Sequence, residues 1–235
     1  MQKAKSMSPE TQLLRRAHQV AGLTVADLAS RLGQRTPANL LSNKGWMGQL
    51  LERWLNAQSA SKAQPDFPEL GIELKTLPVS LKGRPLESTY VCMAPLLELA
   101  QVSFDNSVVA AKLRKVLFVP IIGARNWPPG QRQIGQAFYW QPSASQWARI
   151  RRDFEELTEL IATGHIDRID GRLGQVLQIR PKGPNGQALT ASHNANGEKI
   201  LTLPRGFYLR ASFTQEILTR AMFSSLSDQK TYGVT

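Results

Sequence analysis

Apolar residues recur every three or four positions through the first third of the chain, which predicts amphipathic helices. Capping signals divide this region, because Thr24 can cap a helix that Gly33 ends, and Thr36 followed by Pro37 can begin the next one. Helices are therefore expected over residues 8–21, 24–33 and 36–56, with a break at 43–45.

The period changes after Pro65, where β-branched and aromatic residues become frequent. Strands are expected over residues 71–79, 89–95, 116–122 and 137–140, followed by a helix over 143–164. Shorter strands at 176–180, 200–203 and 206–209 precede a last helix at 213–223, and the Gly- and Asn-rich segment 182–197 is expected to be a mobile surface loop. This order predicts an α/β fold with a mixed sheet flanked by helices, in one domain over residues 1–235 with a flexible tail at 224–235.

Composition points to an anionic partner. Lys and Arg number 29 against 18 Asp and Glu, a formal charge of +11. Neutralising phosphates releases condensed counterions, so this charge favours nucleic acid, although a membrane surface or no polyanion at all remains open from charge alone. The single cysteine, Cys92, excludes an intrachain disulfide and fits a reducing compartment. Because the chain shows no signal peptide and no apolar run of about 18 residues, we expect a cytoplasmic protein that does not associate with membranes.

The candidate chemistry lies at the start of the expected strand 71–79. Alternation along a strand puts Glu73 and Lys75 on one face, with Cα atoms about 6.6 Å apart. Asp66 comes from the turn before the strand and can bring a second carboxylate beside Glu73. Two carboxylates and the Leu74 carbonyl offer the hard oxygen ligands that suit Mg²⁺. A lysine beside such a metal can orient or deprotonate water, or stabilise charge on a phosphate, so the pattern predicts metal-dependent phosphodiester cleavage.

The same residues have plainer interpretations. Glu73 and Lys75 could both lie on the solvent face of a strand and pair with residues of a neighbouring strand, because Glu-x-Lys occurs by chance in many proteins. Glu52, close to the apolar face of the third helix, could either reach the metal site or pair with Arg53 at the rim of the core. Other chemistries have little support, because the three histidines lack metal-ligand spacing and neither a nucleophile elbow nor a phosphate-binding loop occurs.

Four blocks of sequence, in order along the chain, resemble the MutH family of DNA mismatch repair endonucleases. The similarity covers roughly residues 13–223. The blocks are Asn43-Lys44-Gly45-Trp46 leading to Leu51-Glu52, then Pro65-Asp66 with Gly71-Ile72-Glu73-Leu74-Lys75-Thr76, then Gln178-Ile179-Arg180-Pro181-Lys182, and finally Leu201-Thr202-Leu203-Pro204-Arg205-Gly206-Phe207-Tyr208-Leu209.

This resemblance implies a restriction-endonuclease-like fold in which two lobes form a DNA cleft. It implies Mg²⁺-dependent nicking of the unmethylated strand at hemimethylated GATC, 5′ to the G, leaving a 5′-phosphate and a 3′-hydroxyl. It also implies stimulation by the mismatch repair protein MutL. Ca²⁺ is expected to support DNA binding without cleavage, and we expect the protein to be a monomer.

The resemblance also implies roles for individual residues. Asp66, Glu73 and Lys75 are expected to be catalytic, with Glu52 and Lys112 beside them, and the metal ligands are expected to come from Asp66, Glu73 and Leu74. The expected DNA-binding residues are Lys44, Gly45, Arg180, Pro181, Lys182, Arg205 and Tyr208. Of these, Arg180, Pro181 and Lys182 match the base-reading loop of the family, and Tyr208 matches the residue that senses the adenine methyl group.

Two other functions remain open from the sequence. The first is a stand-alone restriction endonuclease that cuts both strands of GATC, and the second is a DNA-binding protein without catalysis. Without the resemblance, Arg180 and Lys182 would be interpreted as a solvated strand end and Tyr208 as an aromatic residue at the edge of the core.

Overall fold

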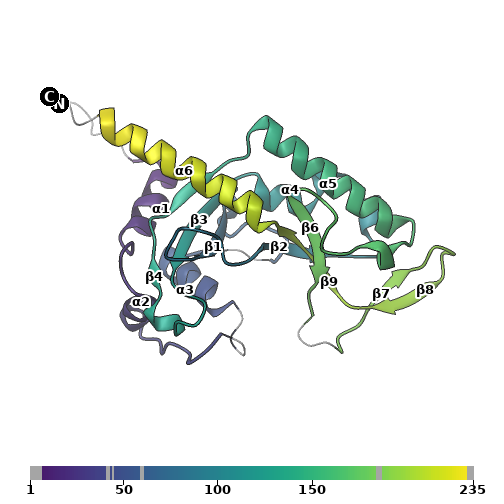
Figure 1. Cartoon of the computed structure of the whole chain (residues 1–235), viewed down its shortest axis with the longest axis horizontal. Helices are drawn as coiled ribbons and strands as arrows, with labels where there is room; N and C mark the ends of the chain where they lie inside the picture. Colours follow the sequence, from purple (N-terminus) through teal and green to yellow (C-terminus); the bar gives the residue numbers. More distant parts are fainter. Residues whose placement is uncertain (1–6, 41–42, 44, 59–60, 184–186, 232–235) are drawn as a thin grey trace. The chain divides into compact units, whose positions relative to one another are not determined.

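The computed structural model describes residues 7–40, 43, 45–58, 61–183 and 187–231 of the 235-residue chain (Figure 1). Contacts divide the chain into two compact units. The first contains Met1–Leu86 and Lys115–Trp140, and the second contains Glu87–Arg114 and Gln141–Thr235. Each unit is therefore assembled from two separate segments of the sequence.

The first unit is built on a mixed sheet with β3 (Val116–Ile122) at its centre. Strand β1 (Glu73–Val79) pairs with the whole of β3 in parallel, and Glu73 lies opposite Val116. The short strands β4 (Gln133–Ile134) and β5 (Phe138–Trp140) pair antiparallel with the two ends of β3. Because β1 occupies one side of β3 throughout, β4 and β5 lie on the other side and β1 is an edge strand of this sheet.

Three helices cover this sheet: α1 (Pro9–His18), α2 (Val25–Arg31) and α3 (Trp46–Leu55). Side-chain caps explain where α1 and α2 begin, because the Ser8 hydroxyl accepts from the Thr11 N–H and Thr24 forms a capping box with Asp27. Their apolar faces meet the sheet in one buried cluster that includes Leu13, Ala17, Val25, Leu28, Leu50, Leu51, Ile72, Leu74, Leu117 and Val119. The helices therefore bury one face of β1, the face that carries Ile72 and Leu74.

A polar contact also fastens α1 to the sheet. The Tyr139 hydroxyl donates to the Glu10 carbonyl at 2.8 Å, and Lys115 Nζ lies 2.6 Å from Glu10 Oε2. The same ammonium lies 5.1 Å from the centre of the Tyr139 ring. Burial raises the pKa of Tyr139 to about 12, and the Glu10 carboxylate adds to this effect.

Replacing Tyr139 with phenylalanine is expected to reduce the loss of stability at alkaline pH. The ordinary pKa of tyrosine is 10.0, so the stability gained by keeping the buried phenol neutral is fully present below that pH and is lost as pH rises towards about 12. Between about pH 8 and about pH 11, the wild type should lose about 1 kcal/mol more unfolding free energy than Tyr139→Phe. Urea unfolding at both pH values checks this, and equal losses in the two proteins would contradict it.

The second unit contains an antiparallel sheet in the order β2 (Thr89–Ala94), β9 (Arg205–Leu209), β6 (Leu177–Pro181). A separate hairpin is formed by β7 (Thr190–His193) and β8 (Lys199–Thr202). The helices of this unit are α4 (Val108–Leu113), α5 (Ala144–Ala162) and α6 (Ala211–Thr231). Short 3-10 turns in the two units are η1 (Pro68–Leu70), η2 (Leu99–Gln101), η3 (Phe104–Asn106), η4 (Pro129–Gln131) and η5 (Ile166–Arg168).

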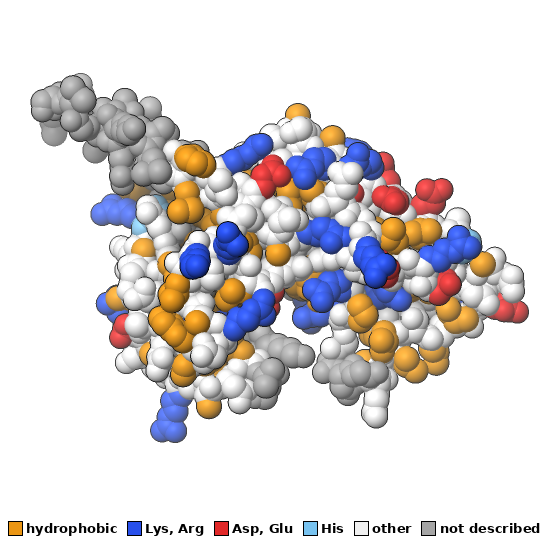
Figure 2. All heavy atoms as spheres, viewed as in Figure 1, with side chains coloured by type: hydrophobic (Ala, Val, Ile, Leu, Met, Phe, Trp, Pro, Cys, Tyr) orange, Lys and Arg blue, Asp and Glu red, His pale blue; other side chains and the backbone are white. Residues whose placement is uncertain are grey.

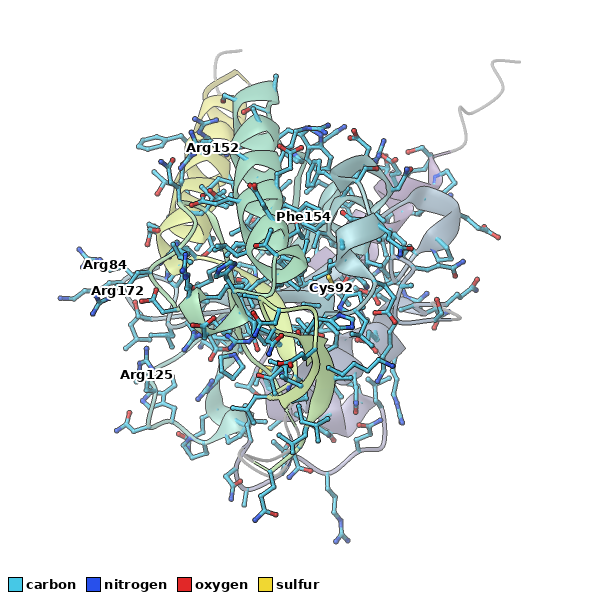
Figure 3. All side chains as sticks on the ribbon, turned by 90° about the vertical axis from the view of Figure 1, so that its right-hand side faces the viewer. Arg84, Cys92, Arg125, Arg152, Phe154 and Arg172 are labelled. Atoms are coloured by element: carbon cyan, nitrogen blue, oxygen red, sulfur yellow. The ribbon has the colours of Figure 1, made fainter. Side chains whose placement is uncertain are left out.

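Helix α5 packs against both the sheet of the second unit and α6. The Phe154 ring stacks on Phe207 of β9 with centroids 5.4 Å apart. Arg149 Nη1 lies 2.9 Å from Glu216 Oε2 of α6, so the two helices contact each other near their N-terminal ends. Cys92 on β2 is a buried free thiol, in agreement with its apolar sequence setting (Figure 3).

The structure confirms the α/β class, with mixed and antiparallel sheets flanked by helices. It corrects several local expectations. Residues 34–40 are not helical, so Thr36-Pro37 does not begin a helix, and the expected loop 182–197 contains β7. Helix α4 and strand β4 were not expected, and α6 continues past Phe223 to Thr231. The cleft between two lobes, the single domain and the flexibility of residues 224–235 remain predictions. In the described part of the chain, no helix is long and apolar enough to span a membrane.

Candidate active site

A tight turn folds Asp66 back against β1. The Phe67 N–H donates to the Ile72 carbonyl at 2.9 Å, and the Ile72 N–H donates to the Phe67 carbonyl at 3.2 Å. Between them, Pro68 begins η1 and Gly71 ends it with a φ of 63°, a left-handed conformation that glycine adopts without strain. The Leu74 N–H then donates to Asp66 Oδ2 at 2.8 Å. The turn therefore places the Asp66 carboxylate on the backbone of the strand that carries Glu73.

Glu73 and Lys75 form a buried ion pair on β1. Lys75 Nζ lies 2.6 Å from Glu73 Oε1, and the two side chains are 15% and 2% exposed. The solvent-face interpretation is therefore wrong for Glu73. Ile72 and Leu74, on the other face of the strand, are buried as well, and so is Leu77 on the Glu73 face. Burying an ionised glutamate costs free energy unless a cation and hydrogen bonds compensate its charge. Buried ionisable residues with a charged partner are typical of functional sites.

The backbone of β1 gives the site its third oxygen. The Glu73 N–H donates to the Lys115 carbonyl at 3.0 Å, so the peptide groups of Glu73 face β3. In a strand the next residue faces the opposite way, which agrees with the Leu74 N–H donating to Asp66. The Leu74 carbonyl points to the same side as its N–H and therefore lies on the Asp66 side of this edge strand. This is the carbonyl that the sequence predicts as a metal ligand.

This donor set fits a hard divalent cation. Within the described residues, no three His, Cys, Asp or Glu side chains form a ready metal cluster. The Asp66 and Glu73 carboxylates and the Leu74 carbonyl could hold a metal together with water, and such a set of oxygens suits Mg²⁺ better than Zn²⁺.

Glu52 and Lys112 are placed differently from the trio. Glu52 lies on α3, which packs against β1, and the Gln58 N–H just after this helix donates to the Asp66 carbonyl at 3.0 Å. Glu52 therefore belongs to the same unit as Asp66 and Glu73. Lys112 belongs to the second unit, where it is buried on α4. Its place beside the trio remains a prediction.

The expected base-reading residues of the second unit form an alternating row of cations and rings. Arg180 Cζ lies 5.8 Å from the centre of the Tyr208 ring, and Lys182 Nζ lies 4.8 Å from that of Tyr90. The two rings pack edge to face at 5.3 Å. A side chain at Gly206 would start only 2.9 Å from the Tyr90 ring and 3.4 Å from Lys182 Cβ, so glycine is required between them. These contacts hold both cations in defined positions.

Tyr90 is a member of this row that the sequence did not indicate. It lies opposite Tyr208 because β2 pairs antiparallel with β9. Only this pairing, which joins strands far apart in the sequence, brings Tyr90 to Lys182. Burial raises the pKa of Tyr208, Glu87 adds to that shift, and the Arg180 guanidinium opposes it. The Tyr208 hydroxyl is therefore neutral near pH 7 and can donate a hydrogen bond.

The four other expected DNA-binding residues have different settings. Lys44 lies outside the described residues. Gly45 adopts a φ of 87° at the start of α3. Arg205 donates to the carbonyls of Ile169 at 3.2 Å and Ile166 at 3.3 Å, and burial lowers its pKa. Any DNA contact by Arg205 would therefore compete with its hold on turn η5. Pro181 ends β6 opposite Arg205.

Comparison with known proteins adds an independent finding. Residues 55–153 match the family model described as "DNA mismatch repair enzyme MutH", a span that includes Asp66, Glu73, Lys75 and Lys112. The chain is 49% identical over 214 residues to the DNA mismatch repair protein MutH of Serratia proteamaculans (strain 568), covering 91% of this chain and 94% of that protein. It is also 49% identical over 214 residues to DNA mismatch repair protein MutH of Escherichia coli O9:H4 (strain HS), covering 90% and 93%.

Proposed function

We propose a detailed function from one established premise, that this chain belongs to the MutH family of DNA mismatch repair enzymes. The chain is a DNA endonuclease of methyl-directed mismatch repair. The finer statement is the proposal: it uses Mg²⁺ to nick the unmethylated strand of hemimethylated GATC, 5′ to the G. The observation that carries it is the buried Glu73–Lys75 pair, with Asp66 bound to the Leu74 N–H between them.

The catalytic steps that we assign to the chain follow from this geometry. Asp66, Glu73 and the Leu74 carbonyl would hold the Mg²⁺, which would supply polarisation of the phosphate and activation of water. Lys75 Nζ, fixed by Glu73 at 2.6 Å, can direct a second N–H to the attacking water or to a phosphate oxygen. Lys75 would act either as a neutral amine that accepts a proton from that water, or as an ammonium that stabilises the charge that develops on the phosphate. The new P–O bond replaces the bond to the 3′ oxygen, which leaves as a 3′-hydroxyl once protonated and leaves a 5′-phosphate.

We assign base and methyl reading to the second unit. Arg180 and Lys182 can donate to the O6 and N7 acceptors of guanine. The Tyr208 ring positions Arg180 and the Tyr90 ring positions Lys182 before DNA binds. Figure 2 shows Lys and Arg side chains gathered over the part of this unit where β6 and β9 lie. Pro181, Gly45, Lys44 and Arg205 are assigned to the DNA-binding surface on the strength of the family resemblance.

Replacing Tyr208 with alanine is expected to weaken discrimination between hemimethylated and fully methylated GATC. A ring that excludes one methyl group contributes about 1–3 kcal/mol, or about 10- to 200-fold in rate ratio. Nicking rates on the two duplexes measure this ratio. Tyr208→Phe is the matched control, because it keeps the ring and removes only the hydroxyl, and it should retain most of the ratio. A wild-type ratio in Tyr208→Ala would contradict the assignment.

We also propose that a MutL-type protein stimulates the enzyme, and that it acts as a monomer in the cytoplasm. Family membership supports the partner, and the single buried Cys92 fits a reducing compartment. The test is a Mg²⁺ cleavage assay on hemimethylated, unmethylated and fully methylated duplexes, with and without the partner. Single-strand nicks that the partner accelerates are expected. Double-strand cuts without the partner would favour a stand-alone restriction endonuclease, and binding that never leads to cleavage would favour a non-catalytic protein.

A further inference from the structure

The loop that leads into β6 is held from two sides by charged side chains outside the proposed catalytic and base-reading groups. These are Asp153 of α5 and Arg210, the residue that follows β9. The loop covers residues 171–176 and is followed by Leu177, the first residue of β6. Its path is tight, because Gly174 has a φ of 76° and a Cβ there would lie only 1.9 Å from the Leu177 carbonyl oxygen.

Asp153 holds the end of this loop through a buried carboxylate. Its side chain is 1% exposed, and Oδ2 accepts from the Val176 N–H at 2.6 Å and from the Leu177 N–H at 2.9 Å. Charge-assisted bonds of this kind are about twice as strong as neutral ones. The second oxygen, Oδ1, is buried and has no hydrogen-bond partner in the described residues. Such a carboxylate is a costly way to gain stability alone, but it fixes two successive N–H groups at one point.

Arg210 holds the other side of the loop. Its Nε donates to the Gly174 carbonyl at 2.7 Å, and Nη2 donates to the carbonyls of Gly171 at 2.9 Å and Leu173 at 2.8 Å. Its backbone N–H donates to the Val176 carbonyl at 2.9 Å. The planar guanidinium is suited to such a set of acceptors, which one ammonium group on lysine cannot reproduce. Arg210 therefore locks the loop to the end of β9.

The two contacts meet where β6 and β9 begin to pair. Leu177 lies opposite Leu209, and the same register puts Gln178 opposite Tyr208 and Arg180 opposite Gly206. A slip of one residue would turn every side chain of β6 to the other face. Arg180 lies three residues beyond Leu177, about 10 Å along the strand, so Asp153 and Arg210 act on it only through the backbone.

We propose that Asp153 and Arg210 are positioning residues for base reading, which set the start and register of β6 and so hold Arg180 and Lys182 against Tyr208 and Tyr90. This inference rests on the proposed function, because it assumes that these four side chains read the GATC site. It predicts that removing the contacts of Asp153 or Arg210 with the loop lowers sequence specificity. General affinity for DNA should remain, since phosphate contacts do not require one register of β6.

The test compares two duplexes that differ by one base pair within GATC. Equilibrium binding of the full chain is measured in Ca²⁺, and the ratio of the two Kd values is the specificity ratio. Asp153→Ala and Arg210→Lys are each expected to lower this ratio about tenfold, while the Kd for the altered duplex stays close to the wild-type value. Asp153→Asn keeps an oxygen acceptor and is expected to restore most of the ratio.

The controls separate positioning from folding. Arg172→Lys makes the same change at an arginine of the same loop that is exposed and points away from the protein (Figure 3), and it should keep the wild-type ratio. If Asp153→Ala does not fold, the specificity ratio of Arg210→Lys tests the inference. This variant is expected to fold, because it keeps the positive charge at a partly exposed position. A folded variant with the wild-type ratio, or equal weakening on both duplexes, would overturn the inference. A wild-type protein without preference for GATC would instead reject the proposed function.

Discussion

Replacing Glu73 with glutamine should abolish strand cleavage, lowering its rate by at least about 1,000-fold, while DNA binding in Ca²⁺ stays close to wild type. The substitution keeps the shape of a side chain that is 2% exposed and removes its charge. In the proposed site this charge has two functions, because it binds the metal and fixes Lys75 Nζ at 2.6 Å. Rates of nicking under single-turnover conditions measure the effect without a contribution from product release.

Glu69→Gln is the matched control for this prediction. Glu69 lies on η1, between Asp66 and Glu73 in the sequence, and its side chain is exposed. Glu69→Gln removes the same charge outside the proposed metal site, so the nicking rate of this variant should remain close to wild type. Cleavage by Glu73→Gln at the wild-type rate would show that the metal is bound elsewhere.

Replacing Lys75 with methionine is the second change with a large expected effect. Methionine keeps an unbranched apolar stem and removes the ammonium, so cleavage should fall by about 100- to 1,000-fold or more. Arginine keeps the charge but presents a larger, planar group, and Lys75→Arg is expected to recover little activity. Rescue by arginine to the wild-type rate would show that the position of the ammonium is unimportant.

The same substitution should also destabilise the fold. Removing the ammonium from the 2.6 Å pair with the buried Glu73 is expected to lower the unfolding free energy by about 3 kcal/mol. The double variant Glu73→Gln with Lys75→Met replaces the ion pair by two neutral groups and should regain most of that stability without regaining cleavage. Urea unfolding and nicking rates of Glu73→Gln, Lys75→Met and the double variant test this. A double variant that is less stable than Lys75→Met would contradict the ion-pair explanation.

The core of the candidate site could be predicted from the sequence because it depends on local geometry. The alternation of a strand puts Glu73 and Lys75 on one side, and the Pro68 and Gly71 turn brings Asp66 back within a few residues. What the local pattern could not show was the burial of Glu73. Glu73 lies opposite Val116 of β3, a strand from a distant part of the chain, and alternation within one segment carries no information about such a neighbour.

Features that depend on long-range pairing, and some short strands, were missed or misplaced. Tyr90 joins Lys182 and Tyr208 only through the register of β2 with β9, and no periodicity within either strand indicates that contact. The β7–β8 hairpin was expected to be partly loop because its segment is rich in Gly and Asn, yet residues as polar as Ser192 and His193 pair with β8. Short elements such as β4 carry too few residues to show a period.

In the proposed mechanism, Asp66, Glu73 and the Leu74 carbonyl would hold the metal with which this enzyme nicks one chosen strand of DNA. The most direct test is to label each strand of a duplex with a single hemimethylated GATC and to map the cut at nucleotide resolution in Mg²⁺ with a MutL-type partner. We predict one nick, 5′ to the G of the unmethylated strand, with a 5′-phosphate, and none with Glu73→Gln. Cleavage of the methylated strand, cleavage of both strands, or the same nick by Glu73→Gln would contradict this account.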